Sequence, residues 1–498
     1  MKVPRSILLS MTALPLAGCA VGPNYTPASP AALGVPAGYS VPADGTVRGD
    51  FTQWWTQFDD PLLTRLVEQA RTANLDVAQA VARLRQAHEA LIQSRSQLFP
   101  SVDASAGYSR NFNIAGGTST ITLPDGTVTS ISRSSGDSFS VSGDVSYQVG
   151  LFGEVRRSVE ASKAEYQGSG YDYATVLTSA ESEVARNYIL ARLYQAQLAN
   201  ARASLAIEDD NLEIAGFRVQ AGLVSSLDEE AARAARAQTA ASIPAIEQSY
   251  NQAVSRLGVL TGQAPGALKE AMAAAAPIPQ GPASIAVGIP ADTLRQRPDV
   301  MSAERGLAAA TARIGVAKAA LYPALNISGN IGTSTNVFSD LFKVITGSVF
   351  AGLSQAIFNG GRLHSEVRSS EAAAEGAFAL YKSTVLTALE DVENTIVALN
   401  AAKERETQYA IAFDAANNSA ILSRAQYRAG LTDFTTLNAA ESSLISAHNG
   451  LTQAKADQAT ALVQLYLALG GGWDSTTAPV APTTPPVFQT ATSPSEDR

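Results

Sequence analysis

Two stretches of the chain alternate between apolar and polar residues, and this pattern constrains the fold more than any other feature. Within 101–114, six of the seven even-numbered residues are apolar, while the odd-numbered residues are Ser, Asp, Gly or Asn. Within 138–151, the odd-numbered residues are apolar except for Gly143. A period of two predicts a β-strand with one apolar and one polar face. Both stretches exceed the usual strand of about 5–6 residues in soluble proteins and suit a tilted strand that crosses a membrane.

The second half of the chain carries the same pattern in a weaker form. Apolar residues alternate with polar ones in 325–331, and further apolar residues mark a fourth strand in 345–357. The connection at 115–137 is rich in Ser, Thr and Gly, which is typical of an exposed hairpin loop. We therefore predict four membrane strands in two hairpins, 101–151 and 324–358.

The composition fits a membrane protein that has no membrane helix. Only 16% of the residues are charged, below the roughly 25% of globular domains, and the mean hydropathy is +0.02. The sequence has no run of 18 apolar residues, so a spanning helix is not predicted. Four strands cannot close a barrel, because lipid leaves no strand edge unpaired and the smallest barrels have about eight strands. Several copies must therefore share one barrel, and the polar strand face predicts a water-filled lumen.

Very long helices are predicted beside the strands. Residues 154–221 contain no proline, and an apolar residue recurs there every seven positions. These residues are Leu177, Val184, Ala191, Leu198, Leu205, Leu212 and Val219. A matching line in the second half runs from Val385 to Tyr427. The spacing is typical of helices that pack as in coiled coils, and such a helix would reach roughly 100 Å, too long for a compact domain.

The chain contains an internal duplication. Ala-Gly-Leu at 221–223 recurs at 429–431, and the segment 257–262 recurs at 465–470, again 208 residues later. We therefore divide the chain as follows: signal peptide 1–18; N-terminal segment 19–59; first repeat 60–262, with hairpin 101–151 and helices 154–221 and 226–262; connector 263–297; second repeat 298–470, with hairpin 324–358 and helices 359–429 and 433–470; disordered tail 471–498.

The N-terminus reads as a lipoprotein signal. A basic start is followed by the apolar stretch 7–16, and residues 16–19 read Leu-Ala-Gly-Cys. Cys19 is the only cysteine of the chain and lies where a bacterial lipobox places its acylated residue. We predict covalent diacylglycerol and palmitate on Cys19; the alternative is a plain secretory signal with an incidental cysteine. By similarity to lipoprotein sorting, Ala20 after the cysteine favours the outer membrane.

Each long helical segment ends at a glycine that precedes a helix N-cap. Gly222 is followed by Ser225 and Ser226, and Gly430 by Thr432 and Asp433. This order predicts a left-handed glycine that stops one helix and a polar side chain that starts the next. Two helical hairpin tips are therefore expected, made of Gly222, Leu223, Val224 and Ser225 in the first repeat and Gly430, Leu431 and Thr432 in the second.

No catalytic or metal site is predicted. The sequence has no P-loop, G-x-S-x-G or H-E-x-x-H motif, and its three histidines, His88, His364 and His448, show no metal-ligand spacing. The net charge of −9 argues against nucleic acid as a partner. We expect no enzyme activity and no cofactor besides the lipid on Cys19.

Several motifs, in their order along the chain, resemble the outer membrane factors. These are Cys19 with Gly-Pro-Asn-Tyr at 22–25, Trp54-Trp55, Asp60-Pro61-Leu62, Arg297-Pro298-Asp299, Ala221 to Asp228 and Tyr427 to Phe434. The family comprises TolC-like trimeric channels, and the chain is most similar to its NodT-type efflux lipoproteins of RND systems. The resemblance covers nearly the whole chain after Cys19.

The resemblance implies a fold, partners and a location. The fold class is an α+β membrane protein in which three chains share a 12-stranded β-barrel, continued by a helical periplasmic tunnel. The homotrimer would lie in the outer membrane, anchored in its lipid, and act as a passive exit duct for drugs and toxic small molecules. A periplasmic adaptor would contact the hairpin tips, and an RND-type inner-membrane pump would supply energy. Tyr427, Arg428 and Asp433 could form the closed periplasmic gate, or a solvated tip face.

Two other functions are compatible with parts of this sequence. A type I protein-secretion exit channel has the same fold, and the lipobox favours efflux over it. A structural lipoprotein that bridges envelope layers would need coiled coils but no barrel, so the alternating strands argue against that reading.

Overall fold

The structure is a computed structural model that describes residues 20–42, 50–112, 114, 118–132, 136–282, 285–288, 290–475 and 479–480. The predicted signal peptide, Cys19 and most of the predicted tail lie outside these residues. The chain forms two compact units. Unit 1 comprises 1–26, 87–166 and 306–377; unit 2 comprises 27–86, 167–305 and 378–498.

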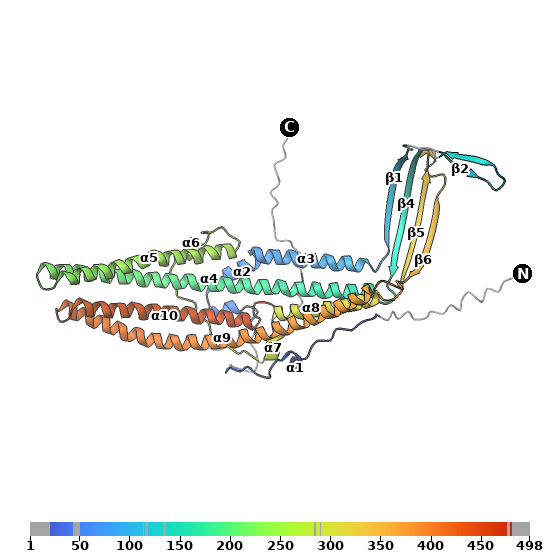
Figure 1. Cartoon of the computed structure of the whole chain (residues 1–498). Coiled ribbons are helices and arrows are strands. Elements are labelled where there is room, and N and C mark those ends of the chain that lie inside the picture. Colours follow the sequence, from blue (N-terminus) through green and yellow to red (C-terminus); the bar gives the residue numbers. More distant parts are fainter. Residues whose placement is uncertain are drawn as a thin grey trace, which may run out of the picture. The chain divides into compact units, whose positions relative to one another are not determined.

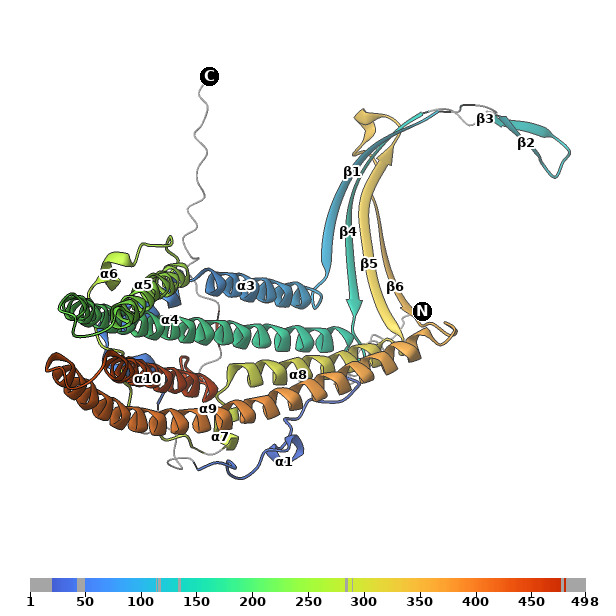
Figure 2. The same cartoon turned by 60° about the vertical axis from the view of Figure 1, so that its left-hand side comes forward.

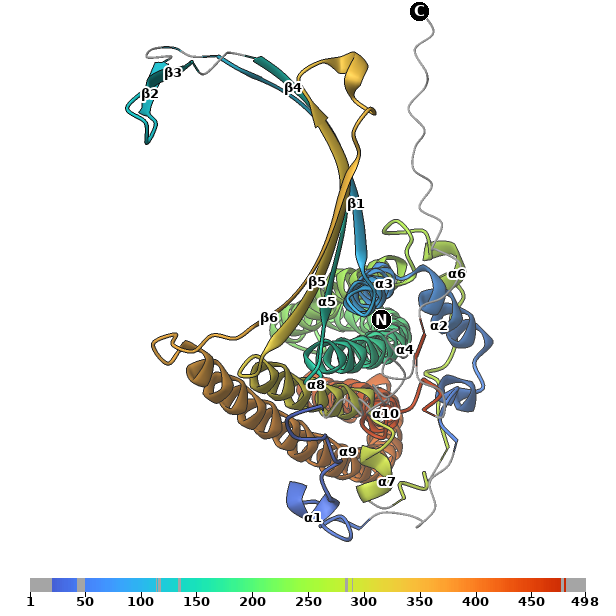
Figure 3. The same ribbon diagram turned by 90° about the vertical axis from the view of Figure 1, so that its right-hand side faces the viewer.

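Unit 1 contains a four-stranded antiparallel sheet with the strand order β1-β4-β5-β6. Its strands are β1 (Ser101–Asn111), β4 (Gly136–Val149), β5 (Ala324–Thr335) and β6 (Thr346–Ser354). Figure 3 shows that the sheet is curved. The two hairpins of the duplicated halves join through β4 and β5, which leaves β1 and β6 as the edges. Four strands form at the places where the sequence predicts them.

The strand register gathers the apolar residues on one face of the sheet. Val102 lies opposite Val145, and Tyr108 lies opposite Phe139. On the other face, Ser105 lies opposite Ser142, and their hydroxyl oxygens are 2.9 Å apart. Because side chains alternate along a strand, this register makes one face mainly apolar and the other mainly polar.

The connection between β1 and β4 holds more structure than the sequence suggests. The predicted loop 115–137 contains a two-stranded ribbon, β2 (Thr118–Thr122) and β3 (Val128–Ser132). Gly126 turns the ribbon with φ +85°, and the Asp125 carboxylate accepts a hydrogen bond from the Thr127 amide. The prediction of an irregular loop is therefore incomplete, because Ser and Thr suit a solvated strand as well as a loop.

The long helices come in two matched pairs. Helix α4 (Glu154–Gln220) and helix α9 (Arg362–Arg428) both have 67 residues, and α5 (Ser226–Leu260) and α10 (Phe434–Ala468) both have 35. Each pair forms a hairpin (Figures 1 and 2). The equal lengths reproduce the internal duplication. Among the described helices, none combines the length and apolar character needed to cross a membrane.

Shorter helices complete the chain. They are α1 (Pro30–Leu33), a 3-10 helix η1 (Trp54–Phe58), α2 (Pro61–Ala73), α3 (Leu75–Ser96), α6 (Lys269–Ala273), α7 (Pro290–Leu294), α8 (Pro298–Ala319) and a 3-10 helix η2 (Phe338–Asp340). The side chain of Asp60 caps α2 by accepting hydrogen bonds from the amides of Leu62 and Leu63. Helix α8 starts at Pro298, after Arg297 of the Arg-Pro-Asp motif, and the Arg297 guanidinium pairs with Asp299.

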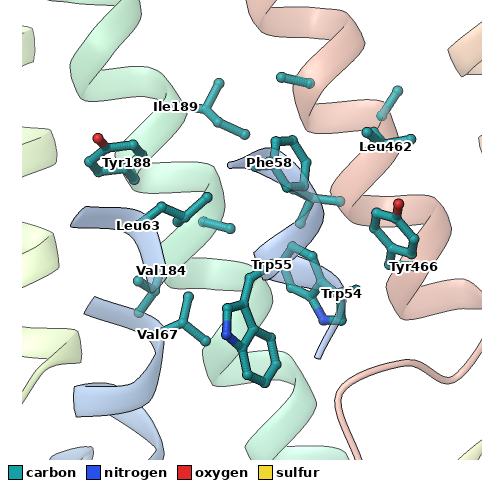
Figure 4. Packing of buried hydrophobic residues seen from close by; sticks show 14 of the residues in the cluster. Trp54, Trp55, Phe58, Leu63, Val67, Val184, Tyr188, Ile189, Leu462 and Tyr466 are labelled. Carbon is teal, nitrogen blue, oxygen red and sulfur yellow. The ribbon is translucent and has the colours of Figure 1, made fainter. Parts of the chain in front are cut away.

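The main core of unit 2 is built around η1. Trp54, Trp55 and Phe58 are buried and pack between α4 and α10, as Figure 4 shows. The Trp54 ring stacks on Tyr466 of α10 at 5.5 Å, and the Tyr188 hydroxyl of α4 donates a hydrogen bond to Asp60. Residues 54–60 therefore link α4 of the first half to α10 of the second.

Candidate functional site

The first hairpin tip stops α4 with a glycine in the left-handed conformation. Gly222 has φ +72°, its amide donates to the Val219 carbonyl at 2.9 Å, and the Leu223 amide donates to the Arg218 carbonyl at 2.9 Å. These two bonds define a Schellman motif. Of the two predicted N-caps, Ser225 caps α5 by accepting a hydrogen bond from the Leu227 amide at 3.2 Å.

The second tip repeats this geometry 208 residues later. Gly430 has φ +74°, its amide donates to the Tyr427 carbonyl at 3.0 Å, and the Leu431 amide donates to the Gln426 carbonyl at 2.9 Å. Of Thr432 and Asp433, Asp433 is the cap: its carboxylate accepts the Thr436 amide at 2.8 Å. That hydrogen bond lowers the pKa of Asp433.

Both tips present a leucine at the same position of the motif. The side chains of Leu223 and Leu431 are 70% and 78% exposed. Val224 and Thr432 follow them and are half-buried. Because the two leucines are matched by the duplication, one chain has two equivalent exposed apolar side chains at its tips.

The three predicted gate residues have different environments. Tyr427 is only 1% exposed: its ring packs edge-on against Phe434 at 6.0 Å, and the Arg218 guanidinium lies over it at 4.6 Å. Asp433 acts as a helix cap, whereas Arg428 is exposed and forms no ion pair with any other described residue. The structure therefore does not bring the three side chains together within one chain.

Arg218 and Phe434 were missed by the sequence reasoning. Arg218 lies on α4 and also donates to the Tyr427 carbonyl at 3.3 Å, so it ties the first hairpin to the second. The sequence does indicate that Tyr427 is buried, because it is the last residue of the seven-residue series in the second half, whose members face another helix.

A buried ion pair joins α9 and α10 beyond the second tip. Arg424 pairs with both carboxylate oxygens of Glu441, at 3.0 Å for Nη2 and Oε2. Glu208 of α4 is also buried, and the Thr239 hydroxyl donates to it at 2.9 Å. Burial raises the pKa of Glu208, and the charge of Glu441 raises it further. Glu208 could have been singled out from the sequence, because it is a carboxyl residue at a position of α4 that the seven-residue spacing predicts to pack against another helix.

The apolar face of the sheet is exposed within a single chain. Val102, Val349 and Leu353 are 73%, 86% and 65% exposed, although they lie on the same face. Aromatic residues lie at both ends of the strands, with Tyr108 against Phe139 at one end and Phe152 stacked on Tyr322 at the other. An apolar band between two aromatic girdles is typical of membrane strands.

No group of three or more His, Cys, Asp or Glu side chains among the described residues could hold a metal ion. The candidate site consists of the surfaces described above: an apolar sheet face, a polar sheet face and two hairpin tips.

Comparisons with known proteins identify the class to which these surfaces belong. The structure resembles the outer-membrane channel OprN, with a TM-score of 0.81 and 30% identity, covering 91% of this chain and all of that one. The Campylobacter jejuni outer membrane channel CmeC has the same fold, with a TM-score of 0.80 at 22% identity, covering 92% and 96% of the two chains. The fold is thus that of outer membrane channels.

The family follows from the sequence comparisons. Residues 66–263 and 289–471 match the family model described as "Outer membrane efflux protein". The chain is 31% identical to "Nodulation protein T" of Rhizobium leguminosarum bv. trifolii, covering 92% of this chain and 96% of that protein. It is 30% identical to "Pyoverdine export outer membrane protein OpmQ" of Pseudomonas putida, covering 95% and 99%. The chain belongs to the outer membrane efflux protein family.

Several predictions are confirmed by these comparisons. The family resemblance was right, and so was the fold class of membrane strands from a shared barrel joined to a helical tunnel. The protein is an outer membrane channel of an efflux system and not an enzyme, because the family is one of transport ducts. It is located in the outer membrane.

Proposed function

We propose that three copies of the chain assemble into one 12-stranded barrel, as a homotrimer. The observation that carries this proposal is the four-stranded sheet with two unpaired edges, β1 and β6, in the described residues. In lipid an unpaired edge is prohibitively costly, so β6 of one copy pairs with β1 of the next around a closed ring. Such a head-to-tail contact closes by rotation without any further component.

The hairpin tips are proposed to dock a periplasmic adaptor, which in turn couples the duct to an RND-type inner-membrane pump. Leu223 and Leu431 support this role, because both are exposed apolar side chains on a rigid turn. In a trimer the duplication would present six such side chains. The six exposed leucines would form a repeating apolar surface to which the adaptor binds.

The cargo is proposed to be drugs and other small toxic compounds. Support comes from the relatives' names, which include "Toluene efflux pump outer membrane protein TtgC" of Pseudomonas putida at 28% identity and the pyoverdine export protein OpmQ. A protein-secretion duct of the same fold is the alternative, and none of the relatives named above is described as one.

The closed gate is proposed to lie at the tips and to involve contacts between copies. Arg428 supports this, because it is exposed and lies two residues before the tip glycine. The Tyr427 hydroxyl is instead buried within its own chain, without a hydrogen-bond partner among the described residues. Arg428→Ala should increase the entry of a large antibiotic such as vancomycin. Tyr427→Phe should leave entry unchanged, since no bond is lost within the chain. Wild-type entry in R428A cells would refute the role of Arg428.

Cys19 is proposed to carry the lipid anchor. The support is the lipobox-like sequence at 16–19 and the absence of any second cysteine in the sequence. Cys19→Ser should abolish incorporation of a labelled fatty acid into the protein. Labelling that persists in this variant would contradict the assignment.

Efflux itself is tested by deleting the gene and restoring it on a plasmid. Cells without the protein should accumulate more of a hydrophobic drug and become more sensitive to it. The wild-type gene should reverse both effects, and the matched variant Leu223→Asp with Leu431→Asp should fail to do so while still reaching the outer membrane. Unchanged sensitivity across a broad panel of small compounds would contradict the efflux function.

A further inference from the structure

One residue on the polar face of the sheet differs in kind from all the others. Along the described strands this face carries Ser, Thr, Asn, Gln, Asp, Gly and one Ala, apart from Phe350 on β6. Phe350 lies directly opposite Ser328 and is 63% exposed. Its neighbours along the strand, Val349 and Ala351, point to the opposite, apolar face. An aromatic ring therefore stands on a wall that is otherwise hydrophilic.

The backbone beside the ring is adapted to it. Gly352 is the next residue on the same face, and a Cβ atom placed there would come within 2.6 Å of the Phe350 ring carbons Cε1 and Cζ. The ring thus leans along β6 over Gly352, and a side chain at that position would displace it. Ser328 on the neighbouring strand is also small, so the outer ring face stays open.

The only charges on the same face lie one row further along the strands. Asp103 of β1 lies opposite Asp144 of β4, and Asp144 lies opposite Asn330 of β5. Two residues along a strand separate this row from that of Phe350, an offset of about 7 Å, and β5 lies between β6 and the strand that carries Asp144. Neither lysine nor arginine occurs on this face in the described strands. The polar face is therefore negative on the strands beyond β5, at roughly 12 Å from its one aromatic ring for Asp144 and farther for Asp103.

We propose that Phe350, together with the aspartate row on β1 and β4, is a specificity-determining subsite for amphiphilic cations on the wall of the duct. The ring offers a stacking and cation–π surface, and the two carboxylates raise the local concentration of positive charge. A weak subsite suits a duct, because a permeating compound must bind and leave again. This inference rests on the proposed function, in which the polar face lines the lumen.

The test compares two ions of the same shape and opposite charge. The purified channel in lipid nanodiscs is titrated with tetraphenylphosphonium and, separately, with tetraphenylborate, and binding to empty nanodiscs is subtracted. Phe350→Ser should weaken tetraphenylphosphonium binding about fivefold, and the double variant Asp103→Asn with Asp144→Asn should weaken it to a similar degree. Neither change should alter the binding of tetraphenylborate. Val349→Ala, on the opposite face of the same strand, is the matched control and should bind as the wild type does.

Three outcomes would overturn the inference. Equal tetraphenylphosphonium binding by the wild type and F350S would remove the role of the ring. An equal loss of tetraphenylborate binding would make Phe350 a general apolar patch. Loss of the oligomer in F350S, with binding retained in an oligomeric Phe350→Leu variant, would make it a packing residue. If instead the wild-type gene fails to restore efflux in deleted cells, the proposed function fails, and that result is independent of the comparison between variants.

Discussion

At the scale of single residues, the two tips depend on glycines that no other residue replaces without strain. Gly222 and Gly430 have φ +72° and +74°, and a Cβ atom at either position would meet no other atom within 4 Å. Space is thus available, and the requirement for glycine comes from the backbone conformation alone. The positive φ could be predicted from sequence because a helix-stop glycine before an N-cap has few alternatives.

We predict that Gly430→Ala destabilises the second tip by about 1 kcal/mol, with a smaller loss for Gly430→Asn. Hydrogen exchange at the Leu431 amide should become faster in the same order. Gly376 offers a control on the same helix: it has helical dihedral angles and open space, so Gly376→Ala should stabilise the helix by about 1 kcal/mol. A loss of the same size at both positions would contradict the conformational explanation.

A second residue-scale feature is the fully buried carboxyl of Glu181. It pairs with Arg71, whose guanidinium also donates to the Gly472 carbonyl at 2.9 Å. Burial raises the pKa of Glu181 to about 8, and Arg71 opposes that rise. The folded protein therefore binds a proton at this site more tightly than the unfolded chain does.

Stability should consequently fall as the pH rises from about 4.5 to 8, by at most about 1.4 kcal/mol per pH unit from this group. The Glu181→Gln variant has no carboxyl to titrate at this position. The difference between its melting temperature and that of the wild type should therefore shift in favour of the variant as the pH rises across this range. Glu183→Gln, at a half-exposed neighbour, is the control and should track the wild type. A constant difference between E181Q and the wild type at pH 5 and pH 8 would refute the raised pKa.

At the scale of elements, the sequence predicted the parts that depend on local periodicity. The strand segments and both long hairpins lie where a period of two or a heptad line indicated them. The pairing of β4 with β5 was not predictable, because its non-local hydrogen bonds join residues that are 176 to 196 positions apart in the sequence. The β2–β3 ribbon was missed because its Ser and Thr residues serve loops and solvated strands equally. The contact of Arg218 with Tyr427 was not predicted either, because it also joins residues far apart in the sequence.

The strand register can be tested by a disulfide, since Cys19 is the only native cysteine. Ser105→Cys with Ser142→Cys should cross-link under mild oxidation, because the two hydroxyl oxygens are 2.9 Å apart. Ser105→Cys with Val141→Cys should not, because Val141 points to the other face of the sheet. Gel mobility with and without reductant reads out the bond. Cross-linking of the control pair instead would mean that the register is shifted by one residue.

At the scale of the whole molecule, a single chain is an incomplete structure. Its sheet exposes an apolar face and two edges, and its duplicated hairpins end in two equivalent tips. In the proposed trimer, lipid covers the apolar face and neighbouring copies pair with the two edges. The duplication within the chain then becomes a repeat around the duct, with two similar hairpins from every copy.

The native mass of the purified channel tests this account most directly. The protein is extracted from the outer membrane in mild detergent and weighed intact by native mass spectrometry. We predict one species with the mass of three mature, lipidated chains, which separates into single chains only on denaturation. A population made up of single chains under the same mild conditions would contradict the shared barrel.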